Sequence, residues 1–189
     1  MDPTLVLSPR KEGTSLFYVI TLLATALLVM FDFFTKHWAS TSLMINGPVE
    51  LIPNVFEFHY TENRGVAFSM LQGQRWFFIP LSILIAIVVL VILFRSPLHR
   101  YKLFSVMCVL ILSGAIGNLI DRIAYGYVVD FLYFKLINFP IFNVADCYVV
   151  IGACLMFLFV LFVYKEPEDL PIRTILLGIP KKKKEDAHG

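Results

Sequence analysis

The residue types used for covalent and metal chemistry are scarce in this chain of 189 residues, which has three cysteines and four histidines. Cys108, Cys147 and Cys154 all lie in long apolar runs, so the sequence predicts no disulfide framework. The chain contains no Cys-x-x-Cys and no His-Glu-x-x-His motif, so we expect no metal site and no cofactor. No histidine lies near Cys147 in the sequence, and packing is the better interpretation of all three thiols.

Charge is absent from four long stretches, and the chain as a whole is 58% hydrophobic with a mean hydropathy of +0.77. A hydrocarbon core of about 30 Å requires roughly 20 helical residues, and strands of a membrane barrel are much shorter than these runs. The sequence therefore predicts an all-α membrane protein with four transmembrane helices. We expect these spans at about 13–34, 76–94, 103–122 and 146–164.

The distribution of Lys and Arg predicts the orientation of the chain. With four spans both termini lie on one side, and that side carries eleven of the 16 basic residues. Without the distal run Lys181–Lys184 the ratio is still seven to five, so both termini are expected to be cytoplasmic. Residues 1–166 would form the membrane domain. Residues 167–189 would form a basic cytoplasmic tail that faces water or anionic lipid and binds no nucleic acid.

A cleavable signal peptide is the alternative interpretation of the first span. Arg10 and Lys11 precede an apolar run that contains Ala24-Thr25-Ala26, which resembles a cleavage site. The apolar run continues past that tripeptide, so we interpret it as a retained helix.

The two loops on the opposite side, residues 37–75 and 123–143, are too patterned to be simple turns. Alternating residues at Val55–Tyr60 predict a strand, and Val66–Leu71 could form a short amphipathic helix. The second loop is rich in aromatic and β-branched residues and is expected to pair with the first. The sequence thus predicts a small outer-face β subdomain.

Four aspartates lie near the outer ends of the predicted spans: Asp32, Asp121, Asp130 and Asp146. Charge at membrane depth is costly, which makes such residues candidates for a functional site. Each also has a structural interpretation. Asp32 has the spacing of a helical ion pair with Lys36, and Asp121 could pair with Arg122 or a backbone amide. Asp130 could end a strand, and Asp146 could cap the fourth span.

Two carboxylates that lie close together share one proton, because both cannot ionise cheaply. One can then act as a base that takes a proton from the attacking water, and the other as an acid that gives a proton to the peptide carbonyl. This reaction requires no metal ion. On the third span Asn118 and Arg122 lie on one helix face, while Gly114 and Gly117 leave room for a neighbouring helix or a substrate.

At these residues the chain resembles the lipoprotein signal peptidases, the bacterial signal peptidase II family. The matching motifs are Asp32-x-x-x-Lys36, Asn63-x-Gly65-x-Ala67-Phe68, Gly114-Ala115-Ile116-Gly117-Asn118-x-x-Asp121-Arg122, Val129-Asp130-Phe131 and Phe142-Asn143-x-Ala145-Asp146. The family often has two glycines where this chain has Ser113-Gly114, and the tail after Pro167 is longer than usual.

The resemblance implies an intramembrane aspartic endopeptidase that removes signal peptides from diacylglyceryl-modified prolipoproteins, cutting before the lipid-bearing Cys. It implies a monomeric enzyme of the bacterial inner membrane, in contact with lipid, with its site near the periplasmic face. Asp130 and Asp146 would be catalytic. The remaining roles are substrate orientation or site cover by Asn63, Gly65, Asn118, Arg122 and Asn143, and structural support by Asp32, Lys36 and Asp121.

Three other functions remain open from the residues alone. A proton-coupled transporter would place ionisable groups near the bilayer midplane, where this chain has none. A non-enzymatic scaffold would tolerate loss of Asp130. A Ser/Lys peptidase would pair Ser40 or Ser69 with Lys36.

Overall fold

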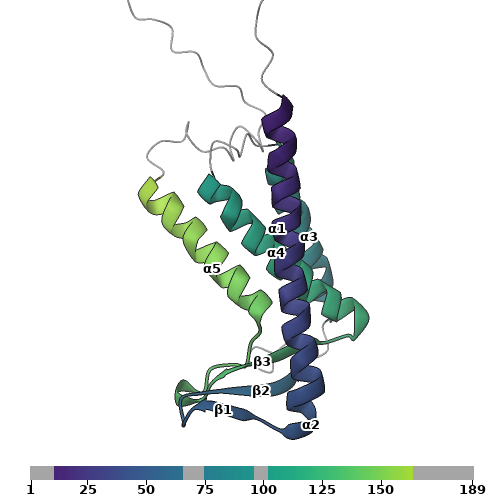
Figure 1. The fold of residues 1–189 in the computed structure, drawn as a ribbon, viewed down its shortest axis with the longest axis vertical. Helices are drawn as coiled ribbons and strands as arrows, with labels where there is room; N and C mark the ends of the chain where they lie inside the picture. The colour runs from purple at the N-terminus through teal and green to yellow at the C-terminus, as the bar shows by residue number, and fades with distance from the viewer. Residues whose placement is uncertain (1–10, 66–74, 96–101, 164–189) are drawn as a thin grey trace, which may run out of the picture.

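The computed structural model describes residues 11–65, 75–95 and 102–163. Four apolar helices run alongside one another, and a three-stranded sheet lies across one end of them (Figure 1). The helices are α1 (Lys11–Trp38), α3 (Arg75–Arg95), α4 (Lys102–Ala124) and α5 (Val144–Leu158), which continues as the π-helical turn η4 (Phe159–Val163). The start of α1 and the end of α5 lie at the end opposite the sheet, as an even number of crossings requires.

Three of the four helices have the length and composition of membrane spans over their described residues, and the fourth is apolar but shorter. Within the described residues, Ser15–Asn46, Lys102–Ala124 and Val144–Phe162 are each long and apolar enough to cross a bilayer, and Phe77–Leu93 forms a shorter apolar stretch within α3. Large apolar side chains such as Leu22 and Phe157 are more than 60% exposed. The predicted class, a helical membrane protein with a small β subdomain, is confirmed.

The first helix extends well beyond its predicted end at residue 34. After Trp38 it continues through a π-helical turn, η1 (Ala39–Leu43), into α2 (Met44–Asn46). The Ser- and Thr-rich sequence there is typical of a loop, but Ala39 and Leu43 are buried against the sheet residues Val129 and Phe131. Packing on the sheet therefore extends the helix past the predicted membrane boundary.

The sheet is antiparallel, with the order β1 (Val49–Ile52), β2 (Phe56–Asn63) and β3 (Val128–Phe134). The predicted strand at Val55–Tyr60 corresponds to β2, and the second outer loop supplies β3 as expected. Thr61 pairs with Asp130 in this sheet, and Asn63 pairs with Val128. The end of β2 is thereby held beside the start of β3.

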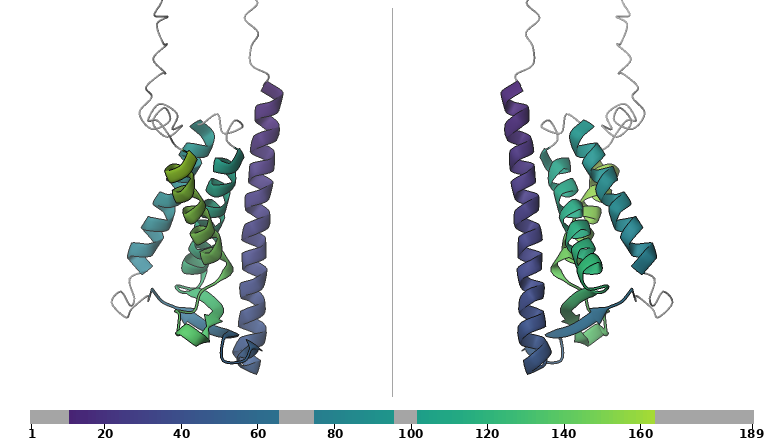
Figure 2. Two further views of the ribbon diagram at one scale, coloured as in Figure 1. Left: turned by 90° about the vertical axis from the view of Figure 1, so that its left-hand side faces the viewer. Right: turned by 90° about the vertical axis from the view of Figure 1, so that its right-hand side faces the viewer.

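Helix α4 is the central helix of the bundle (Figure 2) and contacts α1, α3 and α5. Its buried residues Phe104, Met107 and Leu112 form a core with Ala86 and Val89 of α3. On another face Gly114 lies directly against the backbone of Ala145, and an added Cβ would overlap the Ala145 carbonyl oxygen. At Gly117 an added Cβ would lie 2.5 Å from Asp32 Oδ2.

These two glycines therefore permit the close approach of α1 and α5 to α4. The predicted short helix at Val66–Leu71 and the basic tail at 167–189 lie outside the described residues.

Candidate active site

Asp130 lies in the middle of β3 and is only 1% exposed, although its side chain is acidic. Its two oxygens accept hydrogen bonds from different amides. Asn63 Nδ2 donates to Oδ2 at 2.8 Å, and Asn143 Nδ2 donates to Oδ1 at 2.6 Å. A buried carboxylate is thus held by neutral donors from β2 and from the start of α5.

Asp146 lies in the first turn of α5, where Asn143 is the N-cap. The Asn143 side chain accepts a bond from the Asp146 backbone N–H at 2.9 Å, and Asp146 Oδ2 accepts one from the Asn143 backbone N–H at 3.2 Å. This reciprocal pair is a capping box. The predicted cap of the fourth span is therefore present, with Asn143 as the N-cap and Asp146 as its partner, and Asp146 Oδ1 accepts a further bond from Asn118 Nδ2 at 2.7 Å.

Two asparagines connect the carboxylates. Asn143 Nδ2 donates both to Asp130 Oδ1 and, at 3.1 Å, to Asn118 Oδ1. Asn118 Oδ1 accepts from Asn143 while Asn118 Nδ2 donates to Asp146, so the hydrogen bond between the two asparagines fixes the orientation of both side-chain amides. Four elements, β2, α4, β3 and α5, place the two aspartates within one hydrogen-bonded network.

The ammonium group of Lys36 lies behind this network, 3% exposed. It contacts Asp32 Oδ2 at 2.8 Å, Asp121 Oδ2 at 3.0 Å and Asn118 Oδ1 at 3.0 Å. The expected ion pair of Asp32 with Lys36 is thus present, and Asp32 Oδ1 also accepts from the backbone N–H of Ala145 at 2.8 Å.

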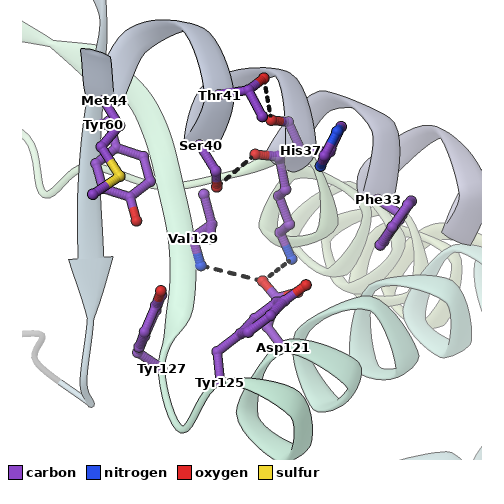
Figure 3. A pocket seen from close by; sticks show the side chains of 11 residues that line it. Phe33, His37, Ser40, Thr41, Met44, Tyr60, Asp121, Tyr125, Tyr127 and Val129 are labelled. Carbon is purple, nitrogen blue, oxygen red and sulfur yellow. Dashed lines mark hydrogen bonds and ion pairs between the residues drawn. The ribbon is translucent and has the colours of Figure 1, made fainter. Parts of the chain in front are cut away.

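Asp121 accepts a bond from the backbone N–H of Val129 at 3.1 Å, so its partners are a backbone amide and Lys36. The residue after Val129 is Asp130, and this contact therefore fixes the start of β3. Asp121 and Val129 line a cavity of about 300 Å³. Ser40, Tyr60 and Tyr125 also line it, as Figure 3 shows.

A second and larger cavity, of about 680 Å³, opens between α3, α4 and α5. Asp146, Asn118, Asn63 and Arg122 line it, whereas Asp130 does not. Its apolar walls come from three helices and from the segment before α5, and include Ile85, Ile111, Val150 and Phe139–Phe142. We call this cavity the groove. One carboxylate of the network therefore faces the groove and the other is buried beside it.

The end of β2 contributes to the site through its backbone geometry. Asn63 Oδ1 accepts a bond from the Gly65 backbone N–H at 3.0 Å, and Gly65 has a φ of +108°, which L side chains rarely adopt. With Oδ1 bonded to Gly65, the Asn63 Nδ2 group is oriented to donate to Asp130. Gly65 therefore acts through Asn63.

Burial is the main reason that the pKa of Asp130 rises to about 7, and the nearby Asp146 raises it further, while Asn63 and Asn143 act in the opposite direction. An unfolded aspartate titrates near 3.9. As the pH rises from about 4 to 7 the unfolded chain loses a proton that the folded protein retains, so the folded state loses stability over this interval.

The Asp130→Asn variant lacks this titration. We expect its melting temperature in detergent to rise relative to wild type between pH 4 and pH 7 and then to level off. The corresponding gain in the free energy of unfolding, relative to wild type, is on the order of 4 kcal/mol. Thermal unfolding followed at a series of pH values measures the difference. A difference between the two proteins that does not change with pH would contradict the assignment of a buried, proton-retaining Asp130.

Two sets of contacts were not predicted from the sequence. Phe78 of α3 lies against Arg122, with the guanidinium carbon 5.3 Å from the ring centroid. On the outer sheet Lys135 pairs with Glu57 at 3.0 Å and with Glu50 at 3.4 Å. These partners come from distant parts of the sequence and follow no motif. Among the described residues, no group of three or more His, Cys, Asp and Glu could hold a metal ion.

Comparison with known proteins gives consistent results. The family model for signal peptidase II matches residues 24–162. Lipoprotein signal peptidases of Streptococcus thermophilus and Caldanaerobacter subterraneus are 41% and 42% identical to the chain, covering 74% and 72% of it and 88% and 92% of their own lengths. That of Symbiobacterium thermophilum is 38% identical and covers 78% of the chain and 98% of its own length.

A similar solved structure is that of a bacterial membrane enzyme determined by the in meso method at 2.3 Å resolution. It superimposes with a TM-score of 0.70 at 32% identity and covers 79% of this chain and 94% of its own. The family match begins within α1 and includes the other three helices, the sheet and both aspartates of the network. The chain is therefore a multi-pass membrane peptidase that belongs to the signal peptidase II family.

Proposed function

We propose that the protein is an intramembrane aspartic endopeptidase that removes signal peptides from diacylglyceryl-modified prolipoproteins, cutting on the N-terminal side of the lipid-modified Cys. The observation that carries this proposal is the pair formed by Asp130 and Asp146, joined through Asn143 and Asn118 at the edge of an apolar groove. The family supplies the substrate class, since its members are lipoprotein signal peptidases.

The different environments of the two aspartates support different roles in peptide hydrolysis. Asp146 lines the groove and serves as the base that takes a proton from the attacking water. Asp130, whose pKa is raised to about 7, still carries a proton in a large share of the molecules at neutral pH and donates it to the carbonyl oxygen of the scissile bond. When the tetrahedral intermediate breaks down, the C–N bond is cleaved as Asp146 gives the proton from water to the leaving nitrogen, and Asp130 takes its proton back from the diol as the new carboxyl group forms.

The groove suits a substrate that is itself an apolar helix. Its walls are largely aliphatic and aromatic, and its polar groups are concentrated at the end where Asn118, Arg122 and Asp146 lie. A signal peptide would occupy the apolar part, which places its C-terminal end beside the carboxylates. The acyl chains of the modified Cys would remain in lipid, as their hydrophobicity favours. We place this end at the periplasmic face of the inner membrane, with both termini cytoplasmic.

The contacts of Lys36 disfavour a Ser/Lys peptidase. Its ammonium contacts Asp32, Asp121 and Asn118, and the Ser40 hydroxyl donates instead to the Lys36 backbone carbonyl at 3.0 Å. Ser69 lies outside the described residues. Membership of a peptidase family also makes the transporter and scaffold hypotheses unnecessary.

The experiment that tests this function compares a diacylglyceryl-modified prolipoprotein with the same precursor before lipid attachment. We expect the purified wild-type enzyme to cleave the lipidated precursor at least about 100-fold faster, a difference of about 3 kcal/mol in transition-state binding. Initial rates from gel shift or mass spectrometry supply the measurement. Equal cleavage of both precursors would refute the proposed substrate class, and no cleavage of either would refute the activity.

A further inference from the structure

Arg122 makes no ion pair within 4.0 Å in the described parts of the chain, although Asp146, Asp130 and Asp121 are near enough to attract its charge. Its one hydrogen bond runs from Nη1 to the backbone carbonyl of Asn118 at 3.3 Å, which is long for such a bond. The side chain nevertheless lines the groove beside Asp146. A guanidinium has five N–H donors, so most of them remain available to a ligand in the groove.

The contact that holds this guanidinium comes from another helix. Phe78 of α3 lies across from the end of α4, and the Arg122 guanidinium carbon is 5.3 Å from its ring centroid. That distance is within the range in which a cation is attracted to the face of an aromatic ring. Phe78 is half-buried, and its ring also contacts Phe77 edge-on, at a centroid distance of 5.4 Å.

Lipid phosphates compete with the groove for the Arg122 side chain. It lies in the last turn of α4, at the end of a membrane span. Long basic side chains at span ends extend toward lipid phosphates, and anionic headgroups strengthen that attraction. Asp146, Asp130 and Asp121 attract the guanidinium electrostatically, but among the described residues no ion pair fixes its position, and the long bond to Asn118 does little to hold it. The Phe78 ring of α3 opposes the movement toward lipid without using the N–H donors of the guanidinium. A carboxylate partner in direct contact would occupy those donors.

We propose that Phe78 is a positioning residue that holds the Arg122 guanidinium in the groove and away from lipid phosphates, so that its N–H groups face the substrate beside Asp146. The inference rests on the function proposed above. It assigns to α3 a role in the reaction in addition to forming a wall of the groove. Phe78 itself does not contact the reacting atoms in this account.

The test uses Phe78→Leu, which keeps an apolar side chain but removes the ring, and Phe78→Tyr, which keeps the ring. Phe31→Leu, at a 57% exposed position on α1, is the control for losing a phenylalanine ring elsewhere in the bundle. Each enzyme is reconstituted in phosphatidylcholine vesicles with and without phosphatidylglycerol. We expect Phe78→Leu to lower kcat/KM for the lipidated precursor between about 3-fold and 30-fold, and more strongly when phosphatidylglycerol is present.

Phe78→Tyr should retain activity within about 3-fold of wild type, and Phe31→Leu should show no added sensitivity to phosphatidylglycerol. A loss in Phe78→Leu that is equal in both vesicle types, or shared by Phe78→Tyr, would overturn the positioning role in favour of simple packing. Wild-type activity in the same vesicles shows separately whether the proposed function holds.

A spectroscopic measurement tests the same contact without requiring activity. In protein labelled with ¹⁵N-arginine, the Arg122 side-chain signal, assigned with Arg122→Lys, should show a ring-current shift in wild type and Phe78→Tyr. The shift should be lost in Phe78→Leu. An Arg122 signal that is unchanged in Phe78→Leu would overturn the inference even if the enzyme proved inactive.

Discussion

Replacing Asp146 with Asn is expected to lower kcat for prolipoprotein cleavage by about 10³-fold or more, because the amide cannot take a proton from water. Asp130→Asn should have an effect of similar size, since the amide cannot donate the proton that stabilises the developing oxyanion. Asn can still accept a hydrogen bond at either position. The side chain at 146 can therefore still accept the bond from the Asn143 backbone N–H, and the start of α5 should remain capped.

Single-turnover rates with enzyme in excess measure this prediction, because they separate chemistry from product release. Thermal unfolding of both variants shows that the fold is retained. The two effects should not be additive in the double variant, because the carboxylates act as one unit. Cleavage by either single variant at a rate within about 10-fold of wild type would remove that residue from the chemistry.

Replacing Lys36 with Met should produce the largest loss of stability among single changes in the bundle. Lys36 is 3% exposed and is the shared partner of Asp32, Asp121 and Asn118. Without the ammonium, two buried carboxylates lose their counter-charge. The loss of one partner from such a cluster costs about 3–5 kcal/mol.

Lys135→Met is the matched control, because Lys135 also pairs with two carboxylates but is 43% exposed. An exposed pair contributes about 0–1 kcal/mol, so this variant should unfold close to the wild-type temperature. Thermal unfolding in detergent compares the two variants. Equal destabilisation by both would contradict the view that burial of the Lys36 cluster determines its importance.

Lys36→Met should also reduce activity, because Lys36 donates to the oxygen of the Asn118 amide. That bond and the one from Asn143 Nδ2 orient the amide so that Nδ2 points to Asp146. With one of the two donors removed, the amide can rotate. We therefore expect Lys36 to support the site by holding, through Asn118, the hydrogen bond to Asp146.

The four helices were predictable from the sequence because the absence of charge over some 18 residues determines a membrane span almost regardless of context. The strand at Val55–Tyr60 was predictable from its alternation. The strand β1 was not predicted, since all four of its residues are exposed and it pairs only with β2. The extension of α1 beyond residue 34 depends on packing against β3, and no local signal in the Ser- and Thr-rich segment indicates it.

The polar residues that gather at the site could be predicted, as could the local bonds of the Asp32–Lys36 pair and of the cap of α5, but the bonds between different elements could not. The capping role of Asp146 is local and follows from its position before an apolar run. The link from Asn143 to Asp130 and Asn118 requires β3, α4 and α5 to converge, and close packing at Gly114 and Gly117 determines how closely they do so. The contact of Phe78 with Arg122 likewise depends on how α3 packs against α4.

The most direct measurement is the mass of both fragments released from a diacylglyceryl-modified prolipoprotein by wild-type enzyme, Asp130→Asn and Asp146→Asn in the same vesicles. We expect one cut by wild type, immediately before the lipid-bearing Cys, and no detectable fragments from either variant in the time that wild type needs to complete the reaction. Fragments from either variant in amounts within about 10-fold of wild type at that time, or a wild-type cut at another bond, would contradict the proposed function.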